Sequence, residues 1–305
     1  MERRDLLKVG GGLAAGMGVV SLLGDSCAAN FVPVRLGVVG GNFGTQFFFH
    51  EHPRCQVVGV SDLRADRRQR LQQTYHCDTA YDSLETMLAQ ATDMNAVAIF
   101  TEATNHAKHV KMAMEKGLHV LSAVPVCTSV EEAEELVSVA KSTGVHYMLA
   151  ETSWYYSTSF HARDLVKSGK LGEIFYTETE YIHDKGDLAA LLSDKTTRYY
   201  NPDGTRSWRW GYPPLLYPTH CTAFVVGVTG ERIVKVSGYG WGTDDHPWCT
   251  ENQYDNPFWN GSASMWTDQG HMSRLNVFWR DGGSGVRAEW HGAEAKFASS
   301  KIDVH

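Results

Sequence analysis

The chain has 305 residues, which is the length of about two soluble domains of ordinary size. Hydrophobic residues make up 43% of it and charged residues 21%, which excludes a disordered chain, a collagen-like chain and a coiled coil. The net charge of −7 argues against a nucleic-acid partner, and no apolar stretch after residue 30 reaches the roughly 18 residues of a membrane-spanning helix.

The N-terminal segment, residues 1–29, has the pattern of an export signal. Arg3-Arg4 precedes Leu6-Leu7-Lys8, a weakly apolar run rich in Gly and Ala covers 9–24, and small residues surround Cys27. Paired arginines in this order are typical of a twin-arginine signal, so we expect a periplasmic protein. The alternative is a mobile basic N-terminus on a cytoplasmic protein. Loss of Cys27 would leave five of the six cysteines, an odd number that indicates free thiols.

Strands and helices alternate along the first half of the chain. Apolar strand patterns cover 34–39, 55–60, 96–100, 119–122 and 146–150, and helical periodicity covers 64–75, 82–91, 106–116 and 130–142. Helix-compatible residues also follow the first strand and continue to His52. This alternation predicts an α/β fold with a parallel, doubly wound sheet, a Rossmann domain over residues 30–151. The charge run within 131–135 fits a solvated helix face.

A glycine-rich turn follows the first strand, and its residues are Gly40, Gly41, Asn42, Phe43 and Gly44. In a dinucleotide site such glycines let the backbone approach the pyrophosphate, which lies at the N-terminus of the next helix. Asp62 follows Gly40 by 22 residues, the spacing of the acidic residue that binds ribose hydroxyls. The turn departs from GxGxxG, because Asn42 and Thr45 occupy two of its glycine positions. We therefore predict bound NAD or NADP, with a degenerate cofactor site as the alternative.

Taken in order, the segments resemble the glucose-fructose oxidoreductase / inositol dehydrogenase (Gfo/Idh/MocA) family. The matching pieces are Gly37–Gly44, Val60–Asp62, Asn95–Thr101, Thr104–His106, Gly117–Ser122, Val130–Leu136, Gly144–Met148 and Ser168–Ile174. The resemblance implies a C-terminal α/β domain, residues 152–305, built on a large, mostly antiparallel sheet, with substrate between that sheet and the nicotinamide. It also implies that Thr101 and His106 lie beside the nucleotide, and that copies of the chain associate through the open sheet.

Two positions depart from the family pattern. The family usually carries Glu-Lys-Pro after the strand that here ends at Ser122, and Val124 stands where the lysine would be. The usual aspartate four residues before the second-domain histidine is replaced by Leu216, so that only His220 of the set remains. The chain thus resembles an exported branch that lacks the lysine. It also ends sooner than the family implies, either by truncation or as a short natural variant.

The nine tryptophans all lie in the second half of the chain. Tryptophan faces stack on sugar rings, so the loop segments Ser207–Trp210 and Asn256–Trp259 indicate a carbohydrate-like substrate. The other tryptophans fit an aromatic core.

Three polar residues are the candidates for catalysis. His220 can act as the acid or base, since histidine titrates near neutral pH. Glu151 ends the last Rossmann strand, where ligands meet open α/β sheets. His183 ends the strand 175–183, in which alternation places Tyr181 and His183 on one face and the glutamates on the other. If the three candidates converge, they could instead bind a divalent metal.

We therefore expect an oxidoreductase that acts on a sugar or sugar derivative with bound NAD(P), with Glu151 and His183 orienting the substrate. The first alternative is a lyase or glycosidase on the same scaffold, without net redox chemistry and with or without a metal. The second is a non-catalytic periplasmic sugar-binding protein.

Overall fold

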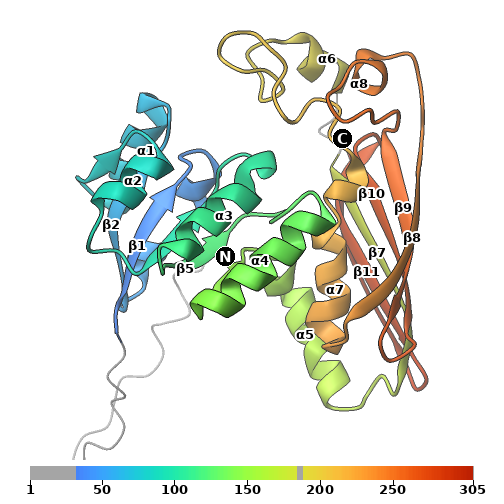
Figure 1. Cartoon of the computed structure of the whole chain (residues 1–305). Helices are drawn as coiled ribbons and strands as arrows, with labels where there is room; N and C mark the ends of the chain where they lie inside the picture. The colour runs from blue at the N-terminus through green and yellow to red at the C-terminus, as the bar shows by residue number, and fades with distance from the viewer. Residues whose placement is uncertain (1–31, 184–187, 305) are drawn as a thin grey trace, which may run out of the picture. The chain divides into compact units, whose positions relative to one another are not determined.

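Two six-stranded sheets carry the fold (Figure 1). The structure is a computed structural model that describes residues 32–183 and 188–304. The expected export signal lies outside the described residues and stays a prediction. No helix in the described part of the chain is long and apolar enough to cross a membrane. The cysteines of this part are all free thiols, as expected: Cys55, Cys77, Cys127, Cys221 and Cys249.

The first sheet is entirely parallel and has the strand order β3-β2-β1-β4-β5-β6. Its strands are β1 (Val34–Val39), β2 (Cys55–Ser61), β3 (Ala80–Tyr81), β4 (Ala96–Ile99), β5 (His119–Ser122) and β6 (Tyr147–Leu149). Its helices are α1 (Ala65–Tyr75), α2 (Leu84–Gln90), α3 (His106–Glu115) and α4 (Val130–Thr143). This order and the alternation with helices are those of a Rossmann domain, which confirms the predicted α/β fold.

The segment after β1 differs from the expectation. It holds two 3-10 turns, η2 (Phe43–Gln46) and η3 (Phe49–Glu51), and residues 40–54 contain no α-helix. Aromatic packing accounts for this, because the rings of Phe43 and Phe47 pack on Phe100. The hydroxyl of Tyr75 lies within hydrogen-bond distance of the carbonyls of Gly44 and Phe47. Those carbonyls therefore find a partner outside the segment. The pyrophosphate end of the predicted site consequently lacks a full helix dipole.

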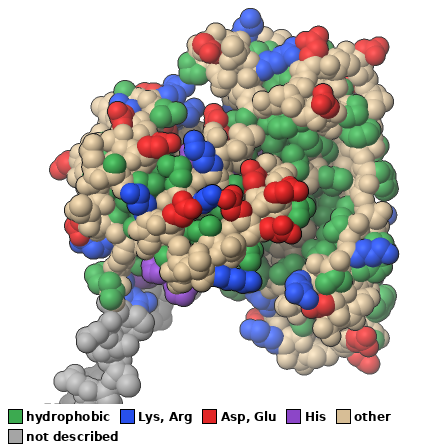
Figure 2. Space-filling view, viewed as in Figure 1, with side chains coloured by type: hydrophobic (Ala, Val, Ile, Leu, Met, Phe, Trp, Pro, Cys, Tyr) green, Lys and Arg blue, Asp and Glu red, His purple; other side chains and the backbone are tan. Residues whose placement is uncertain are grey.

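Helix α4 shows how local sequence sets its ends. Ser129 caps its N-terminus by accepting a hydrogen bond from the Glu132 backbone N–H at 3.1 Å, and Gly144 ends it in the left-handed conformation at φ +70°. Acidic side chains gather on the face of the molecule on which α4 lies (Figure 2). The predicted solvated charge run is therefore confirmed.

The second sheet is mostly antiparallel and has the order β12-β11-β7-β10-β9-β8, in which only the β7–β10 pairing is parallel. Its strands are β7 (Ile174–His183), β8 (Ile233–Trp241), β9 (Asn260–Thr267), β10 (Met272–Phe278), β11 (Gly283–Gly292) and β12 (Lys296–Val304). The elements that accompany this sheet are α5 (Ser157–Lys167), α6 (Leu188–Ser193), α7 (Thr219–Thr229) and α8 (Pro247–Thr250), with 3-10 turns η5 (Thr152–Tyr155) and η6 (Pro214–Leu216). A further 3-10 turn, η4 (Ala103–Asn105), lies between β4 and α3 of the Rossmann domain. Helices α5 and α7 pack together, and α7 covers β7 and β10 on one face of this sheet (Figure 1). The predicted antiparallel domain is confirmed, whereas its association with further copies stays a prediction.

Strand β7 alternates as its sequence predicts. Glu178 and Glu180 lie on one face, where both form ion pairs with Arg287 on β11. Tyr181 and His183 lie on the opposite face, the one that α7 covers. The face that could meet a substrate is therefore the face with Tyr181 and His183.

Most tryptophans belong to the core. Five of the nine are buried: Trp210, Trp248, Trp259, Trp279 and Trp290. The rings of Trp259 and Trp248 stack with centroids 5.3 Å apart, which places the end of the Asn256–Trp259 segment inside the domain. That segment therefore supplies packing, while Trp208 of the other flagged loop remains half-buried.

Candidate active site

The glycine turn after β1 is shaped by close backbone approach. Gly40 adopts φ +100°, and a Cβ atom there would lie 2.3 Å from the carbonyl oxygen of Phe100. A Cβ atom on Gly41 would lie 2.4 Å from the carbonyl oxygen of Arg67. The turn is thus packed between the end of β4 and helix α1, and neither position has room for a larger residue. Asn42, which stands in a glycine position of the motif, is exposed.

Asp62 lies at the end of β2 and closes this cradle. Its carboxylate accepts a hydrogen bond from the Gly41 backbone N–H at 2.7 Å and another from the Arg64 N–H at 2.8 Å. Each carboxylate oxygen has further lone pairs, so Asp62 can still accept two ribose hydroxyls. The Arg64 guanidinium forms an ion pair with Asp66 at 3.0 Å. The cradle therefore fits a nucleotide with a free 2′-hydroxyl.

The other residues expected near the nucleotide have partners within the protein. The Thr101 hydroxyl lies 2.9 Å from Nδ1 of His109. His106 is only 2% exposed, and its ring nitrogens face the carbonyls of Pro125 at 2.6 Å and Thr101 at 3.1 Å. Burial, above all, lowers the pKa of His106. These two side chains therefore hold the loop after β4 in place, and His106 is a buried residue.

Glu151 and His220, by contrast, meet directly. Glu151 follows β6 and His220 lies in the first turn of α7, yet Oε1 of the carboxylate lies 2.7 Å from Nδ1 of the ring. The same oxygen accepts the Ser153 backbone N–H at 2.8 Å. Burial by itself would raise the pKa of the Glu151 carboxyl, but the hydrogen bond and the charge of His220 hold it below its usual value. The carboxylate thus stays ionised and accepts a hydrogen bond from Nδ1. In the neutral form of the ring, this arrangement places the lone pair on Nε2.

Tyr181 joins His183 to this pair. Its ring lies 4.3 Å from the His220 ring, and its hydroxyl lies 3.0 Å from Nδ1 of His183. Burial raises the pKa of Tyr181 well above its usual range, so the phenol stays protonated at neutral pH. The three predicted catalytic residues therefore lie in one neighbourhood, with Tyr181 as the residue between them that the sequence analysis did not single out as catalytic.

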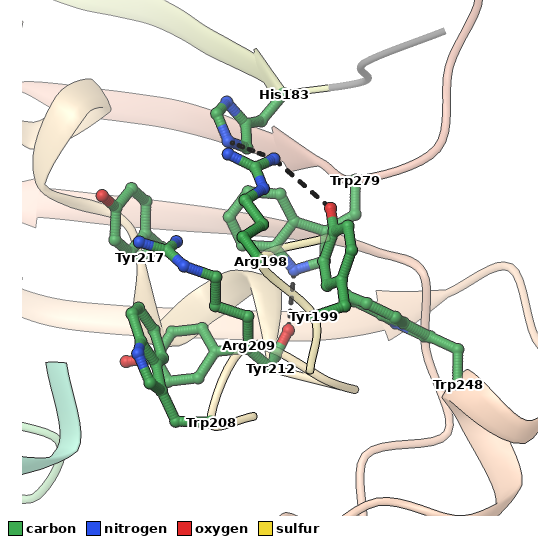
Figure 3. A pocket seen from close by; sticks show the side chains of 9 residues that line it. All are labelled: His183, Arg198, Tyr199, Trp208, Arg209, Tyr212, Tyr217, Trp248 and Trp279. Atoms are coloured by element: carbon green, nitrogen blue, oxygen red, sulfur yellow. Dashed lines mark hydrogen bonds between the residues drawn. The ribbon is translucent and has the colours of Figure 1, made fainter. Parts of the chain in front are cut away.

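A pocket opens beside these residues (Figure 3). Its lining combines aromatic rings with two guanidinium groups and one imidazole: His183, Arg198, Tyr199, Trp208, Arg209, Tyr212, Tyr217, Trp248 and Trp279. The Tyr217 ring also contacts His220, with centroids 5.2 Å apart, and so joins the pocket to the Glu151–His220 pair. Of the arginines, Arg209 lies in the loop flagged for its tryptophans, whereas no local signal marks Arg198.

Comparisons with known proteins agree with this architecture. A model of the oxidoreductase family with an NAD-binding Rossmann fold, GFO_IDH_MocA, matches residues 34–151. Over these residues the chain is therefore similar to the Gfo/Idh/MocA family. Its Rossmann domain is thus of the NAD-binding type that the glycine turn and Asp62 suggested.

The curated relatives that match this chain are longer than it is. A protein of Saccharopolyspora erythraea named a glycosyl hydrolase family 109 protein is 28% identical over 269 residues, which are 77% of this chain and 57% of the relative. A protein of the same name from Shewanella amazonensis is 30% identical over 222 residues, 68% of this chain and 46% of the relative. The chain therefore spans about half the length of the curated relatives it matches.

Solved structures share the fold of this chain. One is scyllo-inositol dehydrogenase from Lactobacillus casei with bound NAD(H) and scyllo-inositol, which superimposes with a TM-score of 0.70. The match covers 88% of this chain and 76% of the dehydrogenase at 18% identity, so it shows the fold alone.

The two departures from the Gfo/Idh/MocA pattern are visible in the structure. Val124, at the lysine position, is 8% exposed and supplies no proton donor or acceptor from its side chain. Leu216, at the aspartate position, ends η6 and packs on the hydrophobic core. Of the three positions of the usual set, only that of His220, which is hydrogen-bonded to Glu151, keeps a side chain able to transfer a proton.

A metal centre has no ligand set here. Within the described residues, no group of three His, Cys, Asp or Glu side chains is placed to hold a metal ion. Tyr181 lies between His183 and His220, and Nδ1 of His220 already donates to Glu151. The metal-assisted alternative thus lacks support in this part of the chain.

Proposed function

We propose that this protein is an NAD-dependent enzyme that cleaves a glycosidic bond of a carbohydrate without net oxidation. The observation that carries the proposal is the buried Glu151–His220 hydrogen bond, at 2.7 Å, beside a pocket with aromatic walls. The name of the curated relatives, glycosyl hydrolase family 109 proteins, supports cleavage over simple oxidation. Val124 in place of the usual lysine supports it too. A chain without that lysine lacks one of the side chains of the usual dehydrogenase set, which fits a reaction other than simple dehydrogenation.

NAD is the nucleotide that the cradle supports. Asp62 keeps acceptor capacity for the ribose hydroxyls and would repel a 2′-phosphate. Arg64, the nearest basic candidate for such a phosphate, is already engaged by Asp66. When bound, NAD would accept a hydride from a sugar carbon and return it at the end; the carbonyl group present in between would make the neighbouring carbon–hydrogen bond acidic, so that loss of that proton expels the aglycone and water adds in its place.

His220 is the residue to which we assign proton transfer. Its Nε2 has no hydrogen-bond partner among the described residues, and 10% of the side-chain surface is exposed. Nε2 would take the proton of a sugar hydroxyl, and the Glu151 carboxylate would stabilise the imidazolium that forms. Tyr181, which stays protonated, would position the His220 ring by packing against it.

One experiment separates the candidate reactions. The purified chain would be incubated with NAD+ and a panel of chromogenic aryl glycosides, and both aglycone release and NADH absorbance would be followed. We expect aglycone release that requires NAD+, no accumulation of NADH, and solvent deuterium on a carbon of the released sugar when the reaction is run in D₂O. Release that is indifferent to NAD+ would reject the proposal.

Net sugar oxidation is the second candidate, and His220 favours it because one positioned base suffices to remove a hydroxyl proton. In that case NADH would accumulate in step with an oxidised sugar while the glycosidic bond stayed intact. A chain that binds sugar but neither NAD+ nor NADP+ would instead be a binding protein.

A further inference from the structure

Two arginines face the pocket without a carboxylate partner among the described residues. The Arg198 guanidinium donates to Nε2 of His183 at 3.4 Å and to the Tyr199 hydroxyl at 3.3 Å. The Arg209 guanidinium lies over the Trp208 ring, 4.2 Å from its centroid. In the part of the chain that the structure describes, neither arginine forms a salt bridge with Asp or Glu, and both side chains lie along the same hollow (Figure 3).

This arrangement contrasts with that of some other half-buried arginines. Arg287, for example, contacts Glu178, Glu180 and Glu289 on the outer face of the second sheet. Arg209 has no Asp or Glu side chain among the described residues that balances its charge in this way. Burial and then the like charge of Arg198 lower its pKa. Two neighbouring cations without a counter-ion destabilise each other, and a bound anion would remove that repulsion.

The shape of the groups narrows the class of anion. A guanidinium presents a planar fork of donors that matches a carboxylate, sulfate or phosphate. Trp208 and Trp279 add flat apolar surfaces, which pack on the faces of sugar rings. The pocket therefore combines features for an oxyanion and for a sugar.

We propose that Arg198 and Arg209 bind the oxyanion of an acidic sugar, either the carboxylate of a uronic acid or a sulfate ester. The inference rests on the proposed function in one respect, since it names the substrate class of the same site. It is a statement about binding and can be tested without turnover. Arg209 would donate hydrogen bonds directly to the anion. Arg198, which His183 and Tyr199 hold in position, would donate to the same anion.

The test is a binding titration of the purified chain in the presence of NAD+. Tryptophan fluorescence is a suitable signal, because Trp208, Trp248 and Trp279 line the pocket. The probes are glucose, galactose and mannose, their uronic acids, and their 6-sulfates. We expect at least one acidic sugar to bind ten times or more as tightly as its neutral parent. The two acidic series show whether the pocket prefers a carboxylate or a sulfate.

Variants assign the preference to the arginines. In Arg209→Gln the ratio of acidic to neutral affinity should fall towards one, and Arg209→Lys should retain part of it. Arg70→Gln removes an equally positive but exposed side chain on α1, far along the chain from the pocket residues, and should leave the ratio unchanged. Thermal melting of each variant verifies that it is folded.

Three results would overturn the inference. These are equal affinity for acidic and neutral sugars, no binding of any probe at millimolar concentration, and loss of NAD+ affinity in Arg209→Gln with the acidic preference intact. The last result would mean that Arg209 serves the nucleotide. Preference for acidic sugars without cleavage would uphold this inference and reject the proposed function, whereas cleavage of neutral glycosides without any preference would do the reverse.

Discussion

At the scale of single residues, the described part of the chain contains two hydrogen-bonded Glu–His pairs in which the histidine is buried, and they differ in which ring nitrogens stay available. In the first, Glu151 lies 2.7 Å from His220; in the second, Glu231 lies 3.0 Å from His271. The His271 ring also bonds to the Thr177 hydroxyl at 2.7 Å, so both of its nitrogens have partners. His220 has one nitrogen without a partner and borders the pocket through Tyr217. The first pair can therefore transfer a proton, while the second serves structure.

This contrast supplies a prediction with a matched control. Glu151→Gln should lower turnover by about 10²- to 10⁴-fold, because the amide cannot stabilise an imidazolium as a carboxylate does. Glu231→Gln makes the same chemical change in the other pair and should leave turnover within a few-fold of the parent. Steady-state kinetics of both variants, with thermal melts alongside, measure the difference. Equal losses of turnover in the two variants would show that the Glu151 effect is only structural.

At the scale of elements, an ion-pair network crosses three strands of the second sheet. Arg287 on β11 donates to Glu180 on β7 at 2.8 and 2.9 Å and to Glu289 at 2.7 Å, and it also contacts Glu178. Arg274 on β10 reaches Glu178 at 2.6 Å. The carboxylates keep only 15–18% of their side-chain surface exposed. The network therefore joins β7, β10 and β11 by more than their backbone ladders.

The network makes stability depend on pH. Burial opposes ionisation of Glu178, but hydrogen bonds from Tyr176 and the two arginines bring its pKa down to about 2, from an ordinary value of 4.5. A carboxyl whose pKa is lower in the folded state stabilises the fold fully above its unfolded pKa and loses that contribution as the pH falls. The contribution of Glu178 should thus be complete above about pH 5 and disappear as the pH approaches 2.

Arg287→Met tests this. We expect it to lower the free energy of unfolding by about 2 kcal/mol at pH 7, because it leaves half-buried carboxylates without their shared cation. The difference in unfolding free energy between this variant and the parent protein should become smaller below pH 4.5. Urea unfolding at pH 7 and pH 3 measures both values. Arg64→Met, which breaks an exposed ion pair with Asp66, is the control and should change little. A gap that is the same at both pH values would contradict the assignment.

At the scale of the whole molecule, nucleotide binding should increase the stability of the protein. A ligand that binds only the folded state raises the protein's free energy of unfolding. NAD+ at about 100 times its Kd would add about 2.7 kcal/mol, and a rise in melting temperature of roughly 5 °C would follow. NADP+ at the same concentration should give a smaller rise, because Asp62 opposes a 2′-phosphate. Asp62→Ala should lose most of the NAD+ effect. A larger shift with NADP+ than with NAD+ would refute the cradle assignment.

Local patterns accounted for most of the Rossmann domain. Strand β1 coincides with its predicted range of 34–39, and α4 extends one residue past the predicted 130–142. Such elements can be predicted from local sequence, because apolar periodicity and end signals such as Ser129 and Gly144 act within a few residues. Local patterns did not account for the segment after β1, which reads as helix-compatible. Contacts with Phe100 and Tyr75, far along the chain, decide its 3-10 form.

For the candidate site, sequence patterns were enough to predict the family resemblance, the glycine turn with Asp62, and three polar residues that lie close together in the fold. They were enough because those residues lie at strand ends or follow the spacing of that family. Tertiary packing was needed to bring Nδ1 of His220 to Glu151, 69 positions away, and to place the Tyr181 face of β7 beside the site. It likewise brought Arg198 and Arg209 to one pocket. Pairings of this kind depend on how sheets and loops pack, and packing has no signature within a short window of sequence.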